Sequence, residues 1–159
     1  IEELCQKRWI DYIRKNSSNA PILNQLPNLE QFMFEPSRNQ LNAVSTVLVE
    51  LQDCKCFYCN KPMRKGNYAV DHFIPWSMYP SDTGHNFVLA DSNCNSKKSN
   101  LLASDEFLHK WQERNEEQDL IIVDRISVLG FLTDKERSHK VAEWAYAQGK
   151  ENNYFLWNG

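Results

Sequence analysis

Two cysteines, Cys56 and Cys59, are separated by two residues and precede the doublet Asp71-His72. Cys-x-x-Cys is the spacing with which a single turn offers two thiolates to one zinc ion. Two thiolates do not complete a metal site, so the remaining ligands must come from another segment, and this requirement constrains the fold. The chain has five cysteines, an odd number. In a reducing compartment, clustered cysteines favour a metal over disulfides.

Cys94 is the next candidate ligand, and Asp91 occupies the position three residues before it. Because a carboxylate oxygen can ligate zinc, Cys56, Cys59, Cys94 and Asp91 form a reasonable structural zinc site. Two alternatives stay open. His85 or His109 can replace Asp91 as the fourth ligand, or the cysteines are small buried residues that hold no metal.

The doublet Asp71-His72 has the side chains of a hydrolytic site. Its carboxylate can hold a divalent cation, and an imidazole with a pKa near 6.5 can take a proton from water at neutral pH. Neighbouring residues of an extended strand point to opposite sides, but Pro75 indicates that the strand ends here. We therefore expect a turn to bring both side chains to one cleft.

The segment around these residues is predicted to contain two strands and a short helix. Residues 68–70 and 87–90 have the composition of short strands, separated by a loop with two prolines and a glycine. Asp91-Ser92 is expected to cap the polar helix that follows, on which Cys94, Asn95 and Lys98 share a face. The expected order is strand, loop, strand, helix.

Helices are predicted on both sides of this segment. The pattern of Ser37 to Gln40 indicates a capping box before a helix that ends just ahead of the cysteines, and residues 2–15 indicate another helix. Residues 105–130 are expected to be helical, although "LIIVDRISVL" fits a strand as well. A second capping box, Thr133 to Glu136, predicts a helix to Gln148 that Gly149 ends.

Taken together, the cysteine pair, Asp-His-x-x-Pro, the Asn86 that opens the second strand and Cys-Asn-x-x-Lys resemble the HNH endonucleases. The resemblance covers Cys56 to about Leu102. The stretches "DHFIPW", "NFVLAD" and "CNSKKS", with their flanking helices, look like those of stand-alone bacterial HNH proteins. It implies an α+β fold, mainly helical, around a small ββα-metal core.

The resemblance also implies roles for individual residues. His72 would be the general base and Asn86 the middle residue of the motif, which we expect to hold the loop that carries His72. Asn95 stands where the last histidine of the motif usually is, as in the HNH domain of the RNA-guided CRISPR nucleases, which looks similar. With Asp71 and Asn95 as oxygen ligands, Mg²⁺ or Mn²⁺ is the expected catalytic metal.

The expected reaction is hydrolysis of a phosphodiester in double-stranded DNA, leaving 5′-phosphate and 3′-hydroxyl ends. Lys97 and Lys98 are expected to neutralise phosphates. The net charge of the chain is −3. Residues 54–104 contain six Lys or Arg and three Asp, so this segment carries +3 and the remainder −6. An acidic body favours low sequence specificity, or targeting by a protein partner or a second copy of the chain.

We expect one compact domain of 159 residues with an HNH core at 54–104 between helical regions at 1–53 and 105–159. A sequence without an apparent signal peptide or membrane span predicts a cytoplasmic protein. A role in restriction or phage defence and a role as a housekeeping or mobile-element nuclease both fit. The main alternative is a non-catalytic zinc module that binds nucleic acid or protein, which does not explain why Asp71, His72 and both asparagines occur together.

Overall fold

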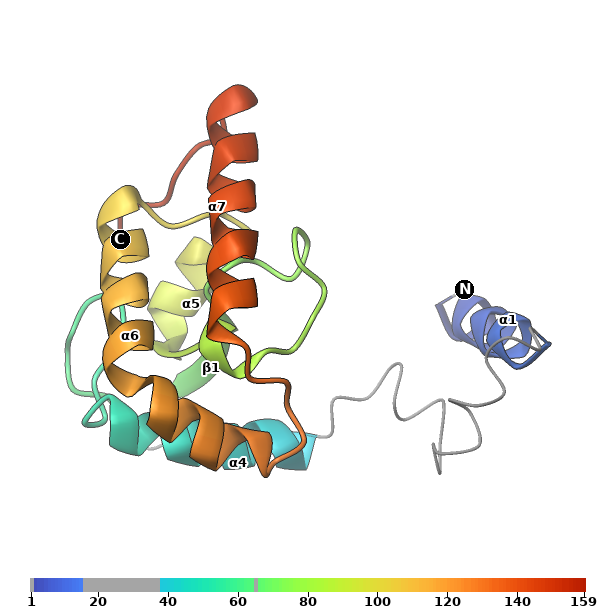
Figure 1. Cartoon of the computed structure of the whole chain (residues 1–159), viewed down its shortest axis with the longest axis horizontal. Helices are drawn as coiled ribbons and strands as arrows, with labels where there is room; N and C mark the ends of the chain where they lie inside the picture. Colours follow the sequence, from blue (N-terminus) through green and yellow to red (C-terminus); the bar gives the residue numbers. More distant parts are fainter. Residues whose placement is uncertain (1, 16–37, 65) are drawn as a thin grey trace. The chain divides into compact units, whose positions relative to one another are not determined.

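The computed structural model describes residues 2–15, 38–64 and 66–159 (Figure 1). The chain divides into two units, Ile1–Asn42 and Ala43–Gly159, which are described separately. The predicted loop between residues 16 and 36, and Ser37 of the first capping box, lie outside the described residues.

The first unit contains α1, which spans Glu2–Lys15 as predicted. Its exposed aromatic residues Trp9 and Tyr12 contact each other edge to face, with 6.0 Å between ring centroids. Helix α4, Arg38–Leu51, crosses the boundary between the units. It ends directly before the cysteine-rich turn, which comprises residues 54–59.

The second unit is built on a two-stranded antiparallel sheet followed by a short helix. Strand β1 (Tyr68–His72) pairs with β2 (Phe87–Asp91), with Asp71 opposite Val88 and His72 opposite Phe87. A single 3₁₀ turn, η2 (Gly84–Asn86), leads into β2, and α5 (Ser92–Lys98) leaves it. This is the strand, loop, strand, helix order that was predicted. Each strand extends slightly beyond its predicted end.

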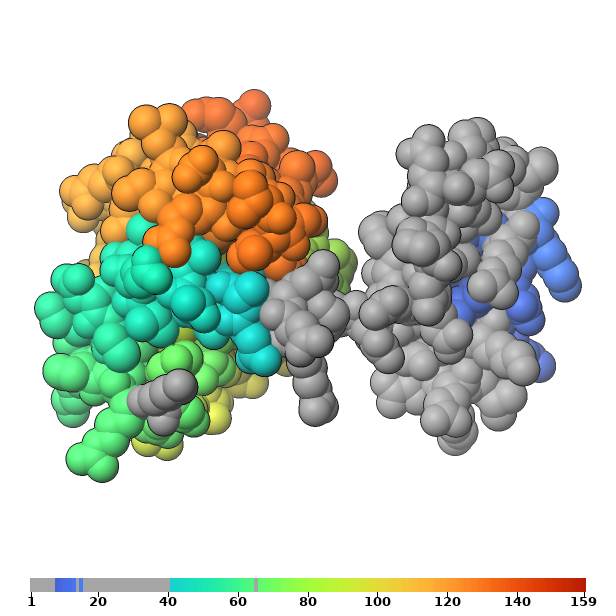
Figure 2. All heavy atoms as spheres, turned by 90° about the horizontal axis from the view of Figure 1, so that it is seen from below, coloured from blue at the N-terminus to red at the C-terminus, as the bar shows by residue number. Residues whose placement is uncertain are grey.

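Two long helices, α6 (Asp105–Ser127) and α7 (Lys135–Glu151), pack on this core (Figure 1). The ambiguous segment "LIIVDRISVL" is helical over most of its length, because Ile122 and Ile126 are one turn apart and both fully buried. Figure 2 shows α4 in teal beside the orange part of α6. There Gln118 Nε2 donates to the Leu51 carbonyl at 3.1 Å, and Arg125 pairs with Glu50.

The predicted ends of α7 are wrong at both termini. Asp134, and not Thr133, caps the helix by accepting from the Arg137 amide at 2.8 Å. Gly149 does not end the helix, which continues to Glu151. A Cβ at position 149 would lie 3.3 Å from Leu102 Cδ1, so the glycine lets α7 pass closely over that side chain.

The C-terminal segment is bound to the stretch that links α5 to α6. The Trp157 amide donates to the Leu102 carbonyl, and the Trp157 carbonyl accepts from the Ser104 amide, both at 2.8 Å. The Trp157 ring is buried against Tyr58, with 4.9 Å between centroids, and stacks on Phe107. The end of the described chain therefore packs beneath the cysteine-rich turn.

The second unit thus has an α+β fold that is mainly helical, with β1, β2 and α5 forming a ββα core. Its interior consists of the buried face of β2, the aromatic residues Phe57, Phe73 and Trp111, and the inner faces of α6 and α7. Among the helices that the structure describes, none has both the length and the apolar character needed to cross a membrane.

Candidate active site and metal centres

A polar hollow of about 350 Å³ lies at the end of β1. Asp71 and His72 both border it although they are neighbours on the strand, because β1 ends at His72 and the chain turns at Pro75. Asn95 of α5 lines the opposite side. The remaining lining residues are Val70, Pro75, Trp76, Ser96, Ser99 and Asn100. The structure therefore brings Asp71, His72 and Asn95 to one cavity.

The Asp71 carboxylate is buried and accepts two hydrogen bonds on a single oxygen. The Tyr58 hydroxyl donates to Oδ2 at 2.6 Å, and Lys98 Nζ lies 3.1 Å from the same atom. Burial, and secondarily the charge of Asp71, raises the pKa of Tyr58 well above its usual value, so the phenol stays protonated and donates. Neither contact involves Oδ1 of the carboxylate.

Lys98 occupies a different place from the one expected. Its side chain is fully buried, and its ammonium also donates to the His72 carbonyl at 2.9 Å. Burial lowers the pKa of Lys98, and Asp71 opposes that shift. In this structure the Lys98 ammonium contacts protein groups in the interior, whereas Lys97 on the same helix is exposed.

His72 is half-buried and oriented by a residue that the sequence analysis did not identify. Its Nε2 lies 2.7 Å from Asp82 Oδ1, and its ring contacts Trp76 and Phe87 edge to face. A carboxylate at Nε2 favours the tautomer with the proton on that nitrogen and leaves a lone pair on Nδ1. Asp82 lies ten positions away in an irregular loop, and no local pattern indicates the contact.

Asn86 is buried and clamps the backbone just after His72. Its Oδ1 accepts from the Ile74 amide at 2.8 Å, and its Nδ2 donates to the Ile74 carbonyl at 3.0 Å. The Asn86 carbonyl in turn accepts from the Phe73 amide. These three bonds fix the turn that follows β1.

The residues that line the hollow include several with side-chain oxygen atoms, namely Asp71, Asn95, Ser96 and Asn100. Carboxylate and amide oxygens are hard ligands that suit Mg²⁺ or Mn²⁺. Because the Asp71 Oδ1 atom is not engaged by Tyr58 or Lys98, the residues present fit a divalent cation here.

Three cysteines, Cys56, Cys59 and Cys94, form a second candidate metal centre, which we call the thiol group. The Sγ atoms of Cys56, Cys59 and Cys94 all lie within 4.8 Å of one another. The Asp91 amide donates to Cys56 Sγ at 3.2 Å. Three convergent sulfur atoms, one of which accepts a backbone N–H, suit a zinc ion, which binds thiolate ligands.

Asp91, the fourth ligand that the sequence suggested, lies outside the group of three convergent cysteines. Its Oδ1 accepts from the Asn93 amide at 2.9 Å as the N-cap of α5, and its Oδ2 accepts from Asn67. Neither of the other two candidates belongs to the thiol group. His85 is buried against Asp119, and His109 is exposed on α6.

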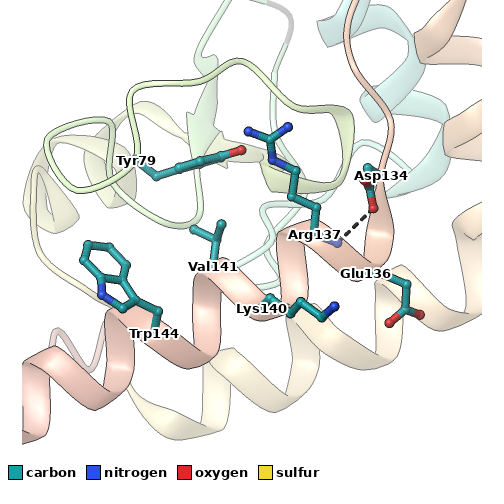
Figure 3. Close-up of a pocket in the computed structure, with 7 residues that line it drawn as sticks. All are labelled: Tyr79, Asp134, Glu136, Arg137, Lys140, Val141 and Trp144. Carbon is teal, nitrogen blue, oxygen red and sulfur yellow. Dashed lines mark hydrogen bonds between the residues drawn. The ribbon is translucent and has the colours of Figure 1, made fainter.

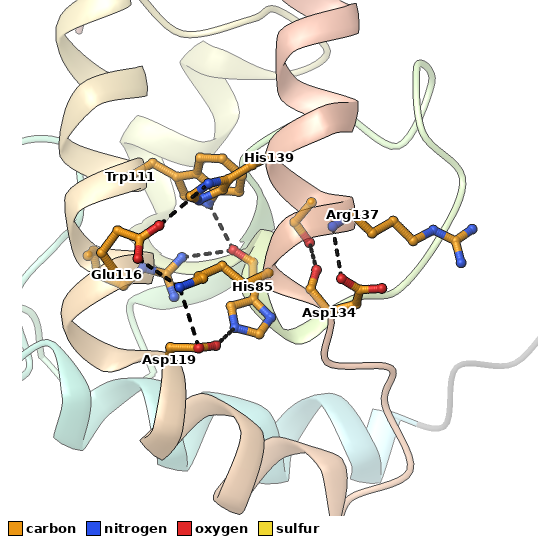
Figure 4. A network of polar contacts seen from close by, with 10 residues as sticks. His85, Trp111, Glu116, Asp119, Asp134, Arg137 and His139 are labelled. Carbon is orange, nitrogen blue, oxygen red and sulfur yellow. Dashed lines mark hydrogen bonds and ion pairs between the residues drawn. The ribbon is translucent and has the colours of Figure 1, made fainter.

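Helices α6 and α7 support the turn that carries Asn86 through a polar network (Figure 4). Trp111 Nε1 and Arg114 Nη2 donate to the His85 carbonyl at 2.9 and 3.1 Å. His85 Nε2 bonds Asp119 at 2.8 Å, and Lys135 joins Asp119 to Glu116. The network holds His85, the neighbour of Asn86 in η2, against α6, and Lys135 extends the network to the start of α7.

A second hollow of about 440 Å³ lies between Tyr79 and α7 (Figure 3). Arg137, Lys140 and the exposed Trp144 line it, whereas Asp71, His72, Asn86 and Asn95 do not. It is therefore distinct from the hollow that contains the expected catalytic residues.

Residues 56–104 match the family model described as HNH endonuclease. Over 91 residues, or 57% of the chain, the sequence is 30% identical to a CRISPR-associated endonuclease Cas9 from Corynebacterium diphtheriae, and the match spans 8% of that protein. The crystal structure of the Type II-C Cas9 enzyme from Actinomyces naeslundii superposes with a TM-score of 0.40 at 18% identity. That superposition covers 82% of this chain and 15% of the other. The chain thus spans a small part of each relative.

Proposed function

Residues 56–104 belong to the HNH endonuclease family, and from this premise we propose that the chain hydrolyses phosphodiester bonds in double-stranded DNA with His72 as general base. The observation that carries the proposal is the shared hollow, which brings an imidazole, a buried carboxylate and an amide together. A non-catalytic zinc module would need only the thiol group and gives no reason for this convergence.

In the proposed reaction, His72 removes a proton from the attacking water. Because Asp82 holds Nε2, the acceptor is the lone pair of Nδ1, and Asp82 stabilises the imidazolium that forms. Asn86 keeps the His72 turn in place through its two bonds to Ile74. The exposed Lys97 contributes positive charge near the substrate phosphates.

Asp71, through Oδ1, and Asn95 are the residues that would hold Mg²⁺ or Mn²⁺. When bound, such a cation neutralises charge that develops on the phosphate and on the departing 3′ oxygen. Cys56, Cys59 and Cys94 would hold zinc in a structural role. The expected products carry 5′-phosphate and 3′-hydroxyl ends.

The first test is cleavage of supercoiled plasmid by purified protein with Mg²⁺, Mn²⁺ or a chelator. His72→Ala is expected to lower the cleavage rate by about 10²–10⁴-fold, the usual contribution of a general base. His109→Ala removes an exposed histidine from α6 and serves as the matched control, with unchanged activity expected. Metal-dependent cutting that survives His72→Ala would refute the assignment of the base.

The biological context is a further part of the proposal. The excess of acidic residues outside 54–104 favours delivery to DNA by a protein partner or a second copy of the chain, in a process such as restriction or phage defence. Co-purification and mass measurement of the native complex test this. Zinc-loaded protein that binds DNA but cleaves no nucleic acid would instead support the non-catalytic module.

A further inference from the structure

The turn that carries two of the three thiols also carries a hydrogen-bond donor to Asp71. Tyr58 lies between Cys56 and Cys59, and its hydroxyl reaches Asp71 Oδ2 at 2.6 Å. The same turn is joined to β2, since the Phe57 amide donates to the Leu89 carbonyl at 2.9 Å. The position of the Tyr58 hydroxyl is thus tied to the geometry of the thiol-bearing turn.

Packing fixes the Tyr58 ring on several sides. Phe57, Phe107 and Trp157 all contact it edge to face, with 5.1, 5.3 and 4.9 Å between centroids. Only 6% of the Tyr58 surface is exposed to solvent. A ring confined in this way directs its hydroxyl to one point with little loss of side-chain entropy.

The second donor to the same oxygen comes from the helix that carries the third thiol. Cys94 and Lys98 are four residues apart on α5, so they lie on one face of that helix. Lys98 Nζ contacts both Asp71 Oδ2 and the His72 carbonyl. Each of the two segments that supply thiols therefore also supplies one donor to Asp71.

We propose that Tyr58 and Lys98 are positioning residues that hold Asp71 Oδ2 and leave Oδ1 for the divalent cation, and that the thiol group sets their positions by joining the turn to α5. The terminal torsion of an aspartate is soft, so two donors on one oxygen fix an orientation that the backbone alone does not. The inference rests on the proposed role of Asp71 in cation binding. It assigns a function in the active site to the thiol group.

The test is a titration of zinc-loaded protein with Mn²⁺, followed by electron paramagnetic resonance of the free ion. Asp71→Asn identifies the Mn²⁺ site that depends on this carboxylate. Tyr58→Phe keeps the ring and removes only the donor, and it is expected to weaken Mn²⁺ binding at that site about tenfold, the lower range for loss of a group that orients a metal ligand. Zinc content and melting temperature verify that the variant is folded.

Tyr146→Phe is the matched control, because it removes a buried tyrosine hydroxyl that donates to the Ala103 carbonyl and not to Asp71. It is expected to leave Mn²⁺ affinity unchanged. Equal Mn²⁺ affinity in the Tyr58→Phe variant and the wild type would overturn the proposal. So would the absence of any Mn²⁺ site that Asp71→Asn removes.

A double-mutant cycle tests the link to the thiol group. Cys59→Ser removes one thiol from the turn, and we expect it to weaken the Asp71-dependent Mn²⁺ site in the wild-type background. In the Tyr58→Phe background the same change should have a smaller effect, because one route from the turn to Asp71 is already cut. An identical factor in both backgrounds would show that the turn does not act through Tyr58.

Cleavage of plasmid by the same samples separates this inference from the proposed function. Weaker Mn²⁺ binding in Tyr58→Phe, with a wild type that cleaves no nucleic acid, would keep the positioning role and remove the nuclease. Active wild type with unchanged Mn²⁺ binding in Tyr58→Phe would keep the nuclease and remove the positioning role.

Discussion

The end of β1 is held from two sides, and the two sides differ in what they require. On the thiol side, Tyr58 and Lys98 converge on one carboxylate oxygen from segments whose sulfur atoms lie within 4.8 Å of one another. On the helix side, the buried α6 residues Trp111 and Arg114 donate hydrogen bonds to the His85 carbonyl. The thiol side acts on Asp71 in β1, whereas the helix side acts on η2, whose Asn86 bonds the Ile74 backbone just after β1.

The contacts on the helix side form when the chain folds and need no metal ion. Trp111 is fully buried and stacks on Phe73, next to His72, with 4.9 Å between centroids. Burial lowers the pKa of Arg114 to about 9, which still leaves it charged at neutral pH. The thiol side gathers three cysteines that a metal ion would join. Burial thus supports one side of the site, and a metal ion would support the other.

The largest expected effect breaks the helix side. Trp111→Ala should lower the free energy of unfolding by about 3–5 kcal/mol, as for other buried tryptophans, whether or not zinc is present. Urea denaturation with and without chelator measures this. Trp144→Ala, at a residue that is 51% exposed, is the control and should change stability far less. If the effect of Trp111→Ala disappeared after chelation, the helix side would depend on zinc and the two sides would not be independent.

The second prediction breaks the thiol side. Free zinc at about 100 times its dissociation constant should stabilise the wild-type protein by about 2.7 kcal/mol, since it binds the folded state. Cys94→Ala should abolish this increment. Cys54→Ala should keep it, because Cys54 bonds the Met63 carbonyl and lies outside the thiol group. Thermal melts over a zinc series measure the increment, and a zinc response retained by Cys94→Ala would contradict the site.

The smallest expected effect is a pH dependence of the free energy of unfolding that arises from His85 on the helix side. Burial lowers the pKa of His85, against the opposing influence of Asp119 and with smaller contributions from Arg114 and His139. The unfolded chain therefore binds a proton near pH 6.5 that the folded protein does not. As the pH falls through this value, the free energy of unfolding should decrease by at most about 1.4 kcal/mol per pH unit, until the folded pKa is reached.

Urea denaturation between pH 7.5 and pH 5 measures this slope, in buffers whose pH is the variable. His85→Gln cannot titrate and should show a shallower dependence over the same range. Asp119 contributes at lower pH, because His85 and Lys135 lower its pKa below the ordinary carboxyl range. A slope in His85→Gln equal to that of the wild type would place the pH response elsewhere.

Local sequence patterns were sufficient to predict most of the secondary structure. The periodicity of residues 2–15 and 38–51, and the cap at Asp91, depend on neighbours within one turn, and the helices begin or end where these patterns do. The same cap explains a difference from the expected zinc site. Asp91 uses both carboxylate oxygens in local hydrogen bonds and lies outside the group of three cysteines, which spacing alone could not predict.

The contacts that orient the site could not be read from the sequence, because they join distant segments. Asp82 bonds His72 across a loop without periodicity, and Tyr58 reaches Asp71 from a turn whose sequence pattern points only to its cysteines. Lys98 was assigned to the surface since it lies in a polar helix of seven residues. Only the packing of α5 on β1 shows that this lysine points inward.

The contact between Trp157 and Tyr58 limits which segment of the chain could be transplanted in protein engineering. Residues 56–104 match the family model, yet one wall around Tyr58 comes from a tryptophan more than fifty positions later in the chain. A cassette limited to those residues would expose the Tyr58 ring to water and loosen the anchor of Asp71. A transplantable unit must therefore include the segment that ends at Trp157.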